Sequence, residues 1–552
     1  MLLKTHVEKM TENWSLAMLM KSKELKSLSG DVDEKKGSCL RILSLFLGLL
    51  IPQSVLASTL HIQVVDESDQ PTWGRLEVHG AGGKMYQPAE ALRDLTAGTH
   101  NVQADYLGSF IVHGDCEIEV PPGRYLVIGE HGTEYRRVEK SVTVAGQGVT
   151  NVTVPLRPWI RMWKMGWWSG DLHVHRPPAD AEKAVLAEDL NFCPVITDWP
   201  HRKNYQFQTG DIWGADANAL IGIDARHSVT LRNAEDERGG GAWLFLQLQA
   251  PLHGLNAATD WWPSALSFIH HARDQRASQA IFPWVDVEKP FWWEVPVAMA
   301  LAPPDSMEIL CNQLTEYGIE ASEAWGRPRD RSFAGREGWV NYLLSLYYHY
   351  LNLGFHLPAS AGTASGVLPN PIGFNRVYVN FSGPFSVEKW FRALREGPSF
   401  VTNGPMLFFH LKPEGALMKA TVEAHSREPL DRIEIVANGE IIEWYPLPPG
   451  TDDFQAEFTI DPQKYSWVAA RCFLPGGDTL RLAHTSPVYL PGHYDCRSDA
   501  KYYVDWMDNL IHQTKENPKR FPSATEQEQE LGTYGQALAF YQQKLAQGCT
   551  GN

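Results

Sequence analysis

The centre of the chain contains the segment Trp167-Trp168-Ser169-Gly170-Asp171-Leu172-His173-Val174-His175-Arg176-Pro177-Pro178. Side chains alternate between the two faces of an extended strand, so His173 and His175 point to one side, together with Asp171. Leu172 and Val174 point to the other side, into a core. Imidazole and carboxylate groups bind divalent metals. The spacing therefore predicts a metal-binding strand end, although a bare His-x-His also occurs at strand rims that bind nothing.

The whole chain has the size and composition of a multidomain globular protein. It has 552 residues, of which 43% are hydrophobic and 21% are charged. The net charge of −16 argues against nucleic acid as a partner. The 20 tryptophans suit a large core, and some of them could line a ligand cleft or an interface. A small-molecule or glycan-like substrate fits this composition, and the oligomeric state stays open.

Residues 1–57 have the pattern of an export signal. Lys35, Lys36 and Arg41 precede an apolar run from Ile42 to Ile51, and small residues follow up to a predicted cleavage site after Ala57. The run is too short to span a bilayer, and no later segment is long and apolar enough to do so. We therefore expect a periplasmic or extracellular protein. The six cysteines beyond the signal could pair there, in an order that the sequence does not show.

The rest of the chain divides into four regions by pattern. Short strands and turns over 58–157 predict a β-sandwich, and a second sandwich of Ig type is predicted over 406–492. Between them, strands alternate with helices over 158–405, as in an α/β barrel whose chemistry lies at the strand ends. Residues 493–552 are polar and helix-forming, which predicts a helical C-terminal extension.

Two regions resemble known families. The order Pro121-Pro122-Gly123-Arg124-Tyr125 within the first sandwich resembles transthyretin-like or carboxypeptidase-regulatory-like modules. Gly170 to His175 resembles the first motif of the PHP superfamily, and the central region is similar to CehA/McbA-type metallohydrolases. Six further segments carry that second resemblance in collinear order: 187–190, 194–197, 234–241, 286–293, 358–366 and 401–405.

The second resemblance implies a fold and a set of ligands. The fold is a distorted, TIM-like (β/α) barrel of PHP type, flanked by the two sandwiches and the helical extension. His173 and His175 match the first ligand pair, and Glu235 matches a bridging carboxylate. Where the family has further ligands, this chain has Trp199, Phe282 and the loop Gly362-Thr363-Ala364-Ser365.

The residues near these motifs could complete a smaller centre. Three ligands and an open water position suffice for a mononuclear site, with Asp171 or Asp198 as a further partner. Asp286 and Glu288 lie two residues apart on a predicted strand, so they share a face that metal, Lys or Arg should meet. Lys289 could polarise a substrate oxygen. A structural salt bridge explains the same residues equally well.

The predicted site residues follow from these assignments. The metal ligands are His173, His175, Glu235, Asp171 and Asp286, and the catalytic residues are Glu288, Lys289 and Asp198. One hypothesis is an exported hydrolase in which one or two divalent ions (Zn, Mn or Fe) activate water to cleave an ester, amide, carbamate or phosphoester. The alternative is a catalytically reduced relative that binds a ligand or partner through a Trp-rich cleft.

Overall fold

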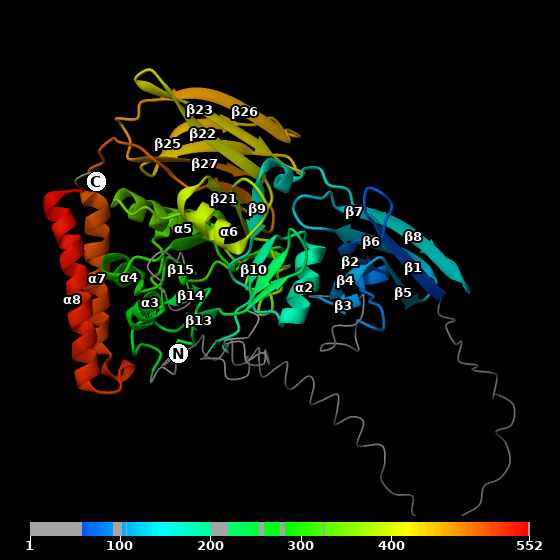
Figure 1. The fold of residues 1–552 in the computed structure, drawn as a ribbon, viewed down its shortest axis with the longest axis horizontal. Helices are drawn as coiled ribbons and strands as arrows, with labels where there is room; N and C mark the ends of the chain where they lie inside the picture. Colours follow the sequence, from blue (N-terminus) through cyan, green and yellow to red (C-terminus); the bar gives the residue numbers. More distant parts are fainter. Residues whose placement is uncertain are drawn as a thin grey trace, which may run out of the picture. The chain divides into compact units, whose positions relative to one another are not determined.

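A computed structural model of the protein describes residues 58–91, 102–105, 108–199, 213, 219–252, 259–275, 282–323 and 326–549 (Figure 1). The predicted signal, residues 1–57, lies outside the described residues. The chain is a mixed α/β protein with several sheets and a C-terminal pair of helices, which confirms the coarse fold class predicted above. In the part of the chain described here, no helix combines the length and apolarity needed to span a membrane.

The N-terminal region contains two sheets around one core. Their strand orders are β5-β1-β8 and β3-β4-β2-β6-β7. Leu60 and Ile62 of β1 and Leu76 and Val78 of β2 belong to this core, so each sheet turns one apolar face inward. The strands are β1 (Ser58–Val65), β2 (Trp73–His79), β3 (Val102–Ala104), β4 (Phe110–His113), β5 (Asp115–Val120), β6 (Gly123–Glu130), β7 (Val138–Val144) and β8 (Val149–Pro155).

The central region has one long sheet and one five-stranded sheet. The long sheet has the order β11-β12-β10-β9-β20-β21-β28-β27-β24-β25, with β29 paired to β27, and the other sheet has the order β13-β14-β15-β16-β19. Their strands are β9 (Trp167–Gly170), β10 (Phe192–Pro194), β11 (Leu220–Gly222), β12 (Ser228–Thr230), β13 (Ala234–Glu237), β14 (Ala242–Leu246), β15 (Trp284–Val287), β16 (Ser306–Leu310), β19 (Ala359–Ala361), β20 (Arg376–Asn380), β21 (Ser399–Thr402), β24 (Arg432–Ala437), β25 (Glu440–Pro446), β27 (Trp467–Phe473), β28 (Leu482–Thr485) and β29 (Val488–Tyr489).

Among the described residues, these strands do not close into a barrel, which differs from the barrel that the sequence predicts. The parallel group β12-β10-β9 continues into β20, which is antiparallel to β9. The parallel group β15-β16-β19 is likewise followed on its other edge by the antiparallel strands β14 and β13. Antiparallel neighbours extend both sheets sideways, so the parallel strands stay in two groups.

Helices cover the central sheets and join their strands. Helix α6 (Val387–Glu396) begins after a Ser386 cap, whose hydroxyl accepts the Lys389 N–H at 3.2 Å. Trp390 on its buried face donates to the Trp168 carbonyl of the long sheet at 3.0 Å. The other elements of the central region are α2 (Pro178–Ala187), α3 (Ala265–Asp274), α4 (Val295–Leu301), α5 (Gly335–Asn352), the pair β17 (Leu314–Thr315) and β18 (Gly318–Ile319), and the 3-10 turns η3 (Met162–Met165) and η4 (Arg331–Phe333). Two further 3-10 turns lie outside it: η1 (Ala81–Gly83) follows β2, and η5 (Pro518–Arg520) lies near the C-terminus.

A second two-layer β region shares its sheet with the central region. The three strands β22 (Met406–Glu414), β23 (Leu417–His425) and β26 (Asp453–Ile460) form one layer. They share a core with β24, β27 and β28, which belong to the long sheet. Because β28 pairs with β21, the sheet runs without a break from the central region into this one.

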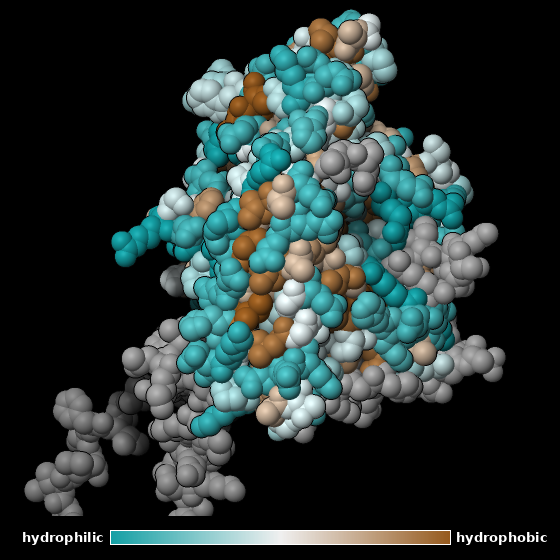
Figure 2. Space-filling view, turned by 90° about the vertical axis from the view of Figure 1, so that its left-hand side faces the viewer, coloured by the Kyte–Doolittle hydropathy of each residue, from teal (hydrophilic) through white to brown (hydrophobic). Residues whose placement is uncertain are grey.

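The C-terminal helices α7 (Arg497–Glu516) and α8 (Ala524–Gln547) form a hairpin beside α4 (Figure 1). A disulfide joins Cys496 to Cys549 and closes the hairpin. The Tyr541 hydroxyl donates to the Pro296 carbonyl at 2.7 Å, which ties α8 to α4. Figure 2 shows this face, where hydrophilic side chains predominate and a band of hydrophobic ones runs between them. The other described cysteines are unpaired and buried: Cys116, Cys193, Cys311 and Cys472.

Candidate metal centre

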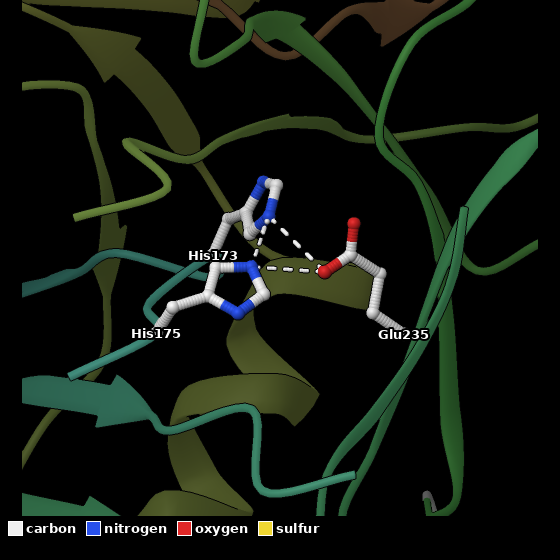
Figure 3. Close-up of side chains that lie close together, drawn as sticks. All are labelled: His173, His175 and Glu235. Carbon is white, nitrogen blue, oxygen red and sulfur yellow. Dashed lines mark hydrogen bonds and ion pairs between the residues drawn. The ribbon is translucent and has the colours of Figure 1, made fainter. Parts of the chain in front are cut away.

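The His-x-His segment follows strand β9 and stays extended beyond its end. Leu172 and Val174 are fully buried in two different cores. Val174 forms isolated parallel bridges with Val195 and with Ser365, so neighbouring segments hold the backbone on both sides. The alternation of an extended chain then places His173 and His175 on one side, as Figure 3 shows.

Three side chains converge at this point. His173 Nε2 lies 3.0 Å from His175 Nε2, and the Glu235 Oε2 atom lies 3.7 Å from the first and 2.9 Å from the second (Figure 3). These separations leave a point about 2.0–2.1 Å from all three atoms, which is the usual length of a zinc–nitrogen bond. The three residues are at most 2% exposed. The donor set therefore fits one divalent ion.

The charge states of these groups also suit a metal. Burial lowers the pKa of His173 to about 4, against the opposite effect of the Glu235 carboxylate. Burial alone would raise the pKa of Glu235, but the charge of His175 and hydrogen bonds from both histidines hold that pKa below its usual value. Neutral imidazole and ionised carboxylate are the forms that bind metal ions. Glu235 Oε2 is buried and faces both imidazole nitrogens, where an ion could bind it.

Backbone pairing brings Glu235 to the histidines. Glu235 lies on β13, and its N–H donates to the Asp198 carbonyl at 3.0 Å. Asp198 and Ala234 form an isolated parallel bridge. Asp198, a predicted catalytic residue, therefore neighbours the centre, and its carbonyl accepts a hydrogen bond from the backbone of Glu235. It is only partly buried, unlike the three ligands.

Glu288 and Lys289, the other predicted catalytic residues, lie on the opposite side of the His173 ring. Glu288 Oε1 is 3.6 Å from His173 Nδ1 and accepts a hydrogen bond from Asn312 at 3.2 Å. The Lys289 ammonium contacts the same oxygen and lies 3.6 Å from Glu237 Oε1. A carboxylate that hydrogen-bonds the far nitrogen of a ligand histidine orients the ring. Here His173 Nδ1 has no hydrogen-bond partner among the described residues, so Glu288 is a charged neighbour of the ring and does not bond it. The prediction that a Lys meets the Asp286–Glu288 pair thus applies to Glu288.

The other two predicted metal ligands have different partners. Asp171 accepts hydrogen bonds from the Thr363 hydroxyl at 2.6 Å and the Gly373 N–H at 2.8 Å, which tie the β9 end to a later loop. Burial raises its pKa to about 6, against the effect of those bonds. Asp286 accepts from the hydroxyls of Ser306 and Ser360. Burial raises its pKa to about 7. Neither carboxylate joins the three converging ligands.

One buried acid near the centre was missed from the sequence. Glu308 on β16 is fully buried, and neither of its carboxylate oxygens has a hydrogen-bond partner. Burial, reinforced by the Asp286 carboxylate, raises the pKa of Glu308 well above its usual value. A Cβ on Gly362 would stand 2.3 Å from both Glu308 Oε1 and His173 Cβ, so these two residues are close neighbours. A glutamate inside the buried strand Ser306–Leu310 was the available signal.

Apolar side chains take the places of the further ligands that the resemblance implies. The Trp199 ring packs on the His175 ring with 4.5 Å between centroids, and Phe282 packs on Phe391 at 5.1 Å. Trp292 and Trp293, two of the tryptophans that could have lined a ligand cleft, are buried in the core. The surroundings of the three ligands are therefore aromatic on the His175 side and acidic on the His173 side.

No family model, no curated protein and no solved structure matches this chain. The resemblance to CehA/McbA-type metallohydrolases stays a prediction that depends on the motifs. The site itself is defined by the geometry above: a buried His-His-Glu cluster able to hold a metal ion.

Proposed function

We propose that this chain is a metal-dependent hydrolase of the CehA/McbA type, with a centre made by His173, His175 and Glu235. The observation that carries the proposal is the convergence of two imidazole nitrogens and one carboxylate oxygen on a single point. Burial also lowers the pKa of His173, which favours the neutral imidazole that binds metal. Two histidines and one glutamate form the ligand set of several catalytic zinc sites, which keep a fourth position for water.

The bound ion would lower the pKa of water to near neutrality and polarise the carbonyl or phosphoryl oxygen of the substrate. The chain's own residues would prepare the site for this. Glu288 lies 3.6 Å from Nδ1 of His173, and the Asp198 carbonyl accepts a hydrogen bond from the Glu235 N–H. Esters, amides, carbamates and phosphoesters are all compatible with such a site, and none of these residues selects among them.

We also propose that the protein is exported. The pattern of residues 1–57 supports this assignment. The disulfide between Cys496 and Cys549 agrees with it, because disulfides persist mainly in oxidising compartments.

A second candidate function is a ligand- or partner-binding protein that has kept only part of the centre. Its support is that Trp199 packs against His175 where the resemblance implies a ligand, and that the three ligands are at most 2% exposed. A site of this kind could hold a structural metal without turning over a substrate.

Metal analysis tests the proposal. We expect about one equivalent of Zn, Mn or Fe in the purified protein, and its loss in the double variant His173→Ala/His175→Ala. The matched control is His270→Ala/His271→Ala, which removes two exposed histidines from α3. A folded wild-type protein without metal contradicts the proposal. The second candidate is favoured if the wild type binds metal but hydrolyses none of a set of chromogenic esters, amides, carbamates and phosphoesters.

A further inference from the structure

A second group of potential ligands adjoins the first. One carboxylate oxygen each from Glu235, Glu237 and Glu288 lie within 4.8 Å of one another. Glu235 belongs to both groups, so the two groups share its carboxylate. A shared carboxylate between neighbouring ligand groups is the usual arrangement of two-metal sites, whose ions lie about 3.5–4 Å apart.

A lysine of the same chain reaches into this second group. The Lys289 ammonium contacts Glu288 Oε1 directly and lies 3.6 Å from Glu237 Oε1. It also lies 5.8 Å from the centroid of the Trp292 ring, and the Lys289 side chain is only 7% exposed. The carboxylates of Glu288 and Glu237 and the Trp292 ring therefore surround the ammonium.

Charge balance explains why a cation is needed there. Glu235 and Glu288 are buried, and Glu288 Oε2 has no hydrogen-bond partner. A buried carboxylate without a cation is strongly unfavourable in its ionised form, so an ammonium or a metal is what keeps such a group charged. Lysine supplies one positive charge and three N–H donors in a compact group, close to the place that a second ion would take.

We propose that Lys289 occupies the position of a second metal ion, so that the native centre binds one ion and the chain without this ammonium binds two. The inference rests on the metal centre proposed above. It adds the number of ions that this centre binds and the physical reason for that number. Lys289 is then a positioning residue: it holds Glu288 against His173 and leaves Glu235 free to bind a single ion.

The test compares the number of ions bound by the wild type and by Lys289→Met, which has a similar length and no charge. Metal-free protein is titrated with Zn²⁺ by calorimetry, and the bound metal is counted by atomic emission after gel filtration. We expect the variant to bind one ion more than the wild type. Loaded with Mn²⁺, the variant should show the spin-coupled resonance of a close pair, and the wild type should show the spectrum of an isolated ion.

Three further variants separate the explanations. Lys289→Arg keeps the charge and should bind as many ions as the wild type. Lys289→Met/Glu237→Gln loses one of the carboxylates and should lose the extra ion. Lys164→Met removes an exposed lysine as a control.

The inference is overturned if Lys289→Met binds no more ions than the wild type, or if the wild type itself binds two. A wild type that binds none contradicts the proposed function, whereas an ion gained by the variant would still support the role of Lys289. Should Lys289→Met fail to fold, Lys289→Gln and the saturation number of the wild type decide the question.

Discussion

Substituting Gly362 by alanine tests how closely the centre is packed. A Cβ at this position would stand 2.3 Å from His173 Cβ and 2.3 Å from Glu308 Oε1. Separations under 3.0 Å essentially do not occur for real Cβ atoms. The His173 contact is the critical one, because that atom is one bond from the backbone and no side-chain rotation moves it away.

The size of the effect follows from these contacts. Overpacking a well-packed core by a methyl group costs about 1–3 kcal/mol, and two simultaneous overlaps place Gly362→Ala near the upper end. The overlap with His173 Cβ can be relieved only if the segment that carries His173 shifts. Disturbing the groups that hold a metal ligand in place typically weakens metal binding about 10–100-fold. We therefore expect a loss of about 3 kcal/mol in unfolding free energy and a 10–100-fold weaker affinity for Zn²⁺.

Urea unfolding of the metal-free protein measures the first quantity, and competition with a chromophoric chelator measures the second. Gly146→Ala is the control, because a Cβ there meets no atom within 4 Å. The variant Glu308→Ala/Gly362→Ala completes a double-mutant cycle with the two single variants. It should restore only part of the loss, since the overlap with His173 remains. A Gly362→Ala protein with the stability and metal affinity of the wild type would refute the reasoning.

Three other predictions concern stability. Replacing Cys496 and Cys549 by serine should lower the unfolding free energy by about 4 kcal/mol, because the disulfide closes a loop with a sequence separation of 53. Urea unfolding with and without reductant checks this, and equal midpoints would contradict it. Burial and the Glu294 carboxylate raise the pKa of Glu530 from 4.5 to about 9, so the folded chain keeps a proton that the unfolded chain releases. Stability should therefore fall as pH rises from 4.5 towards 9, by up to about 1.4 kcal/mol per pH unit, and Glu530→Gln should flatten that slope in urea midpoints measured across the range. Gly532→Ala on the exposed face of α8 should stabilise the protein by about 0.5–1 kcal/mol, because a Cβ there meets no atom and a glycine inside a helix costs conformational entropy. Thermal unfolding measures this, and an unchanged melting temperature would argue against it.

Local patterns predicted the parts of this protein that depend on neighbouring residues. The alternation Leu172-His173-Val174-His175 determines which side chains share a face, and the structure keeps that arrangement even though β9 ends at Gly170. The C-terminal helices follow from a long polar, helix-forming segment. These features arise from periodicity within one element, which a sequence displays directly.

Such patterns could not predict contacts between residues that are distant in the sequence. Asp171 has the spacing of a third ligand, yet its oxygens bond to Thr363 and Gly373. Asp286 shares a face with Glu288 but bonds to two serines of other strands. Which groups meet a carboxylate depends on strand pairing across the sheet, because each strand brings its own donors to the same place.

The sequence by itself determined the two histidines, their common face, the acidic segment around Glu235 and the general α/β character. Only the tertiary structure decided that the parallel strands stay in two open sheets, that Glu235 alone of the acids joins the histidines, and that Lys289 meets Glu288 beside them. The physical reason is that buried charges must be neutralised by groups brought close in space. Spacing along a strand identifies the residues that could be ligands, and packing between strands decides which of those residues meet.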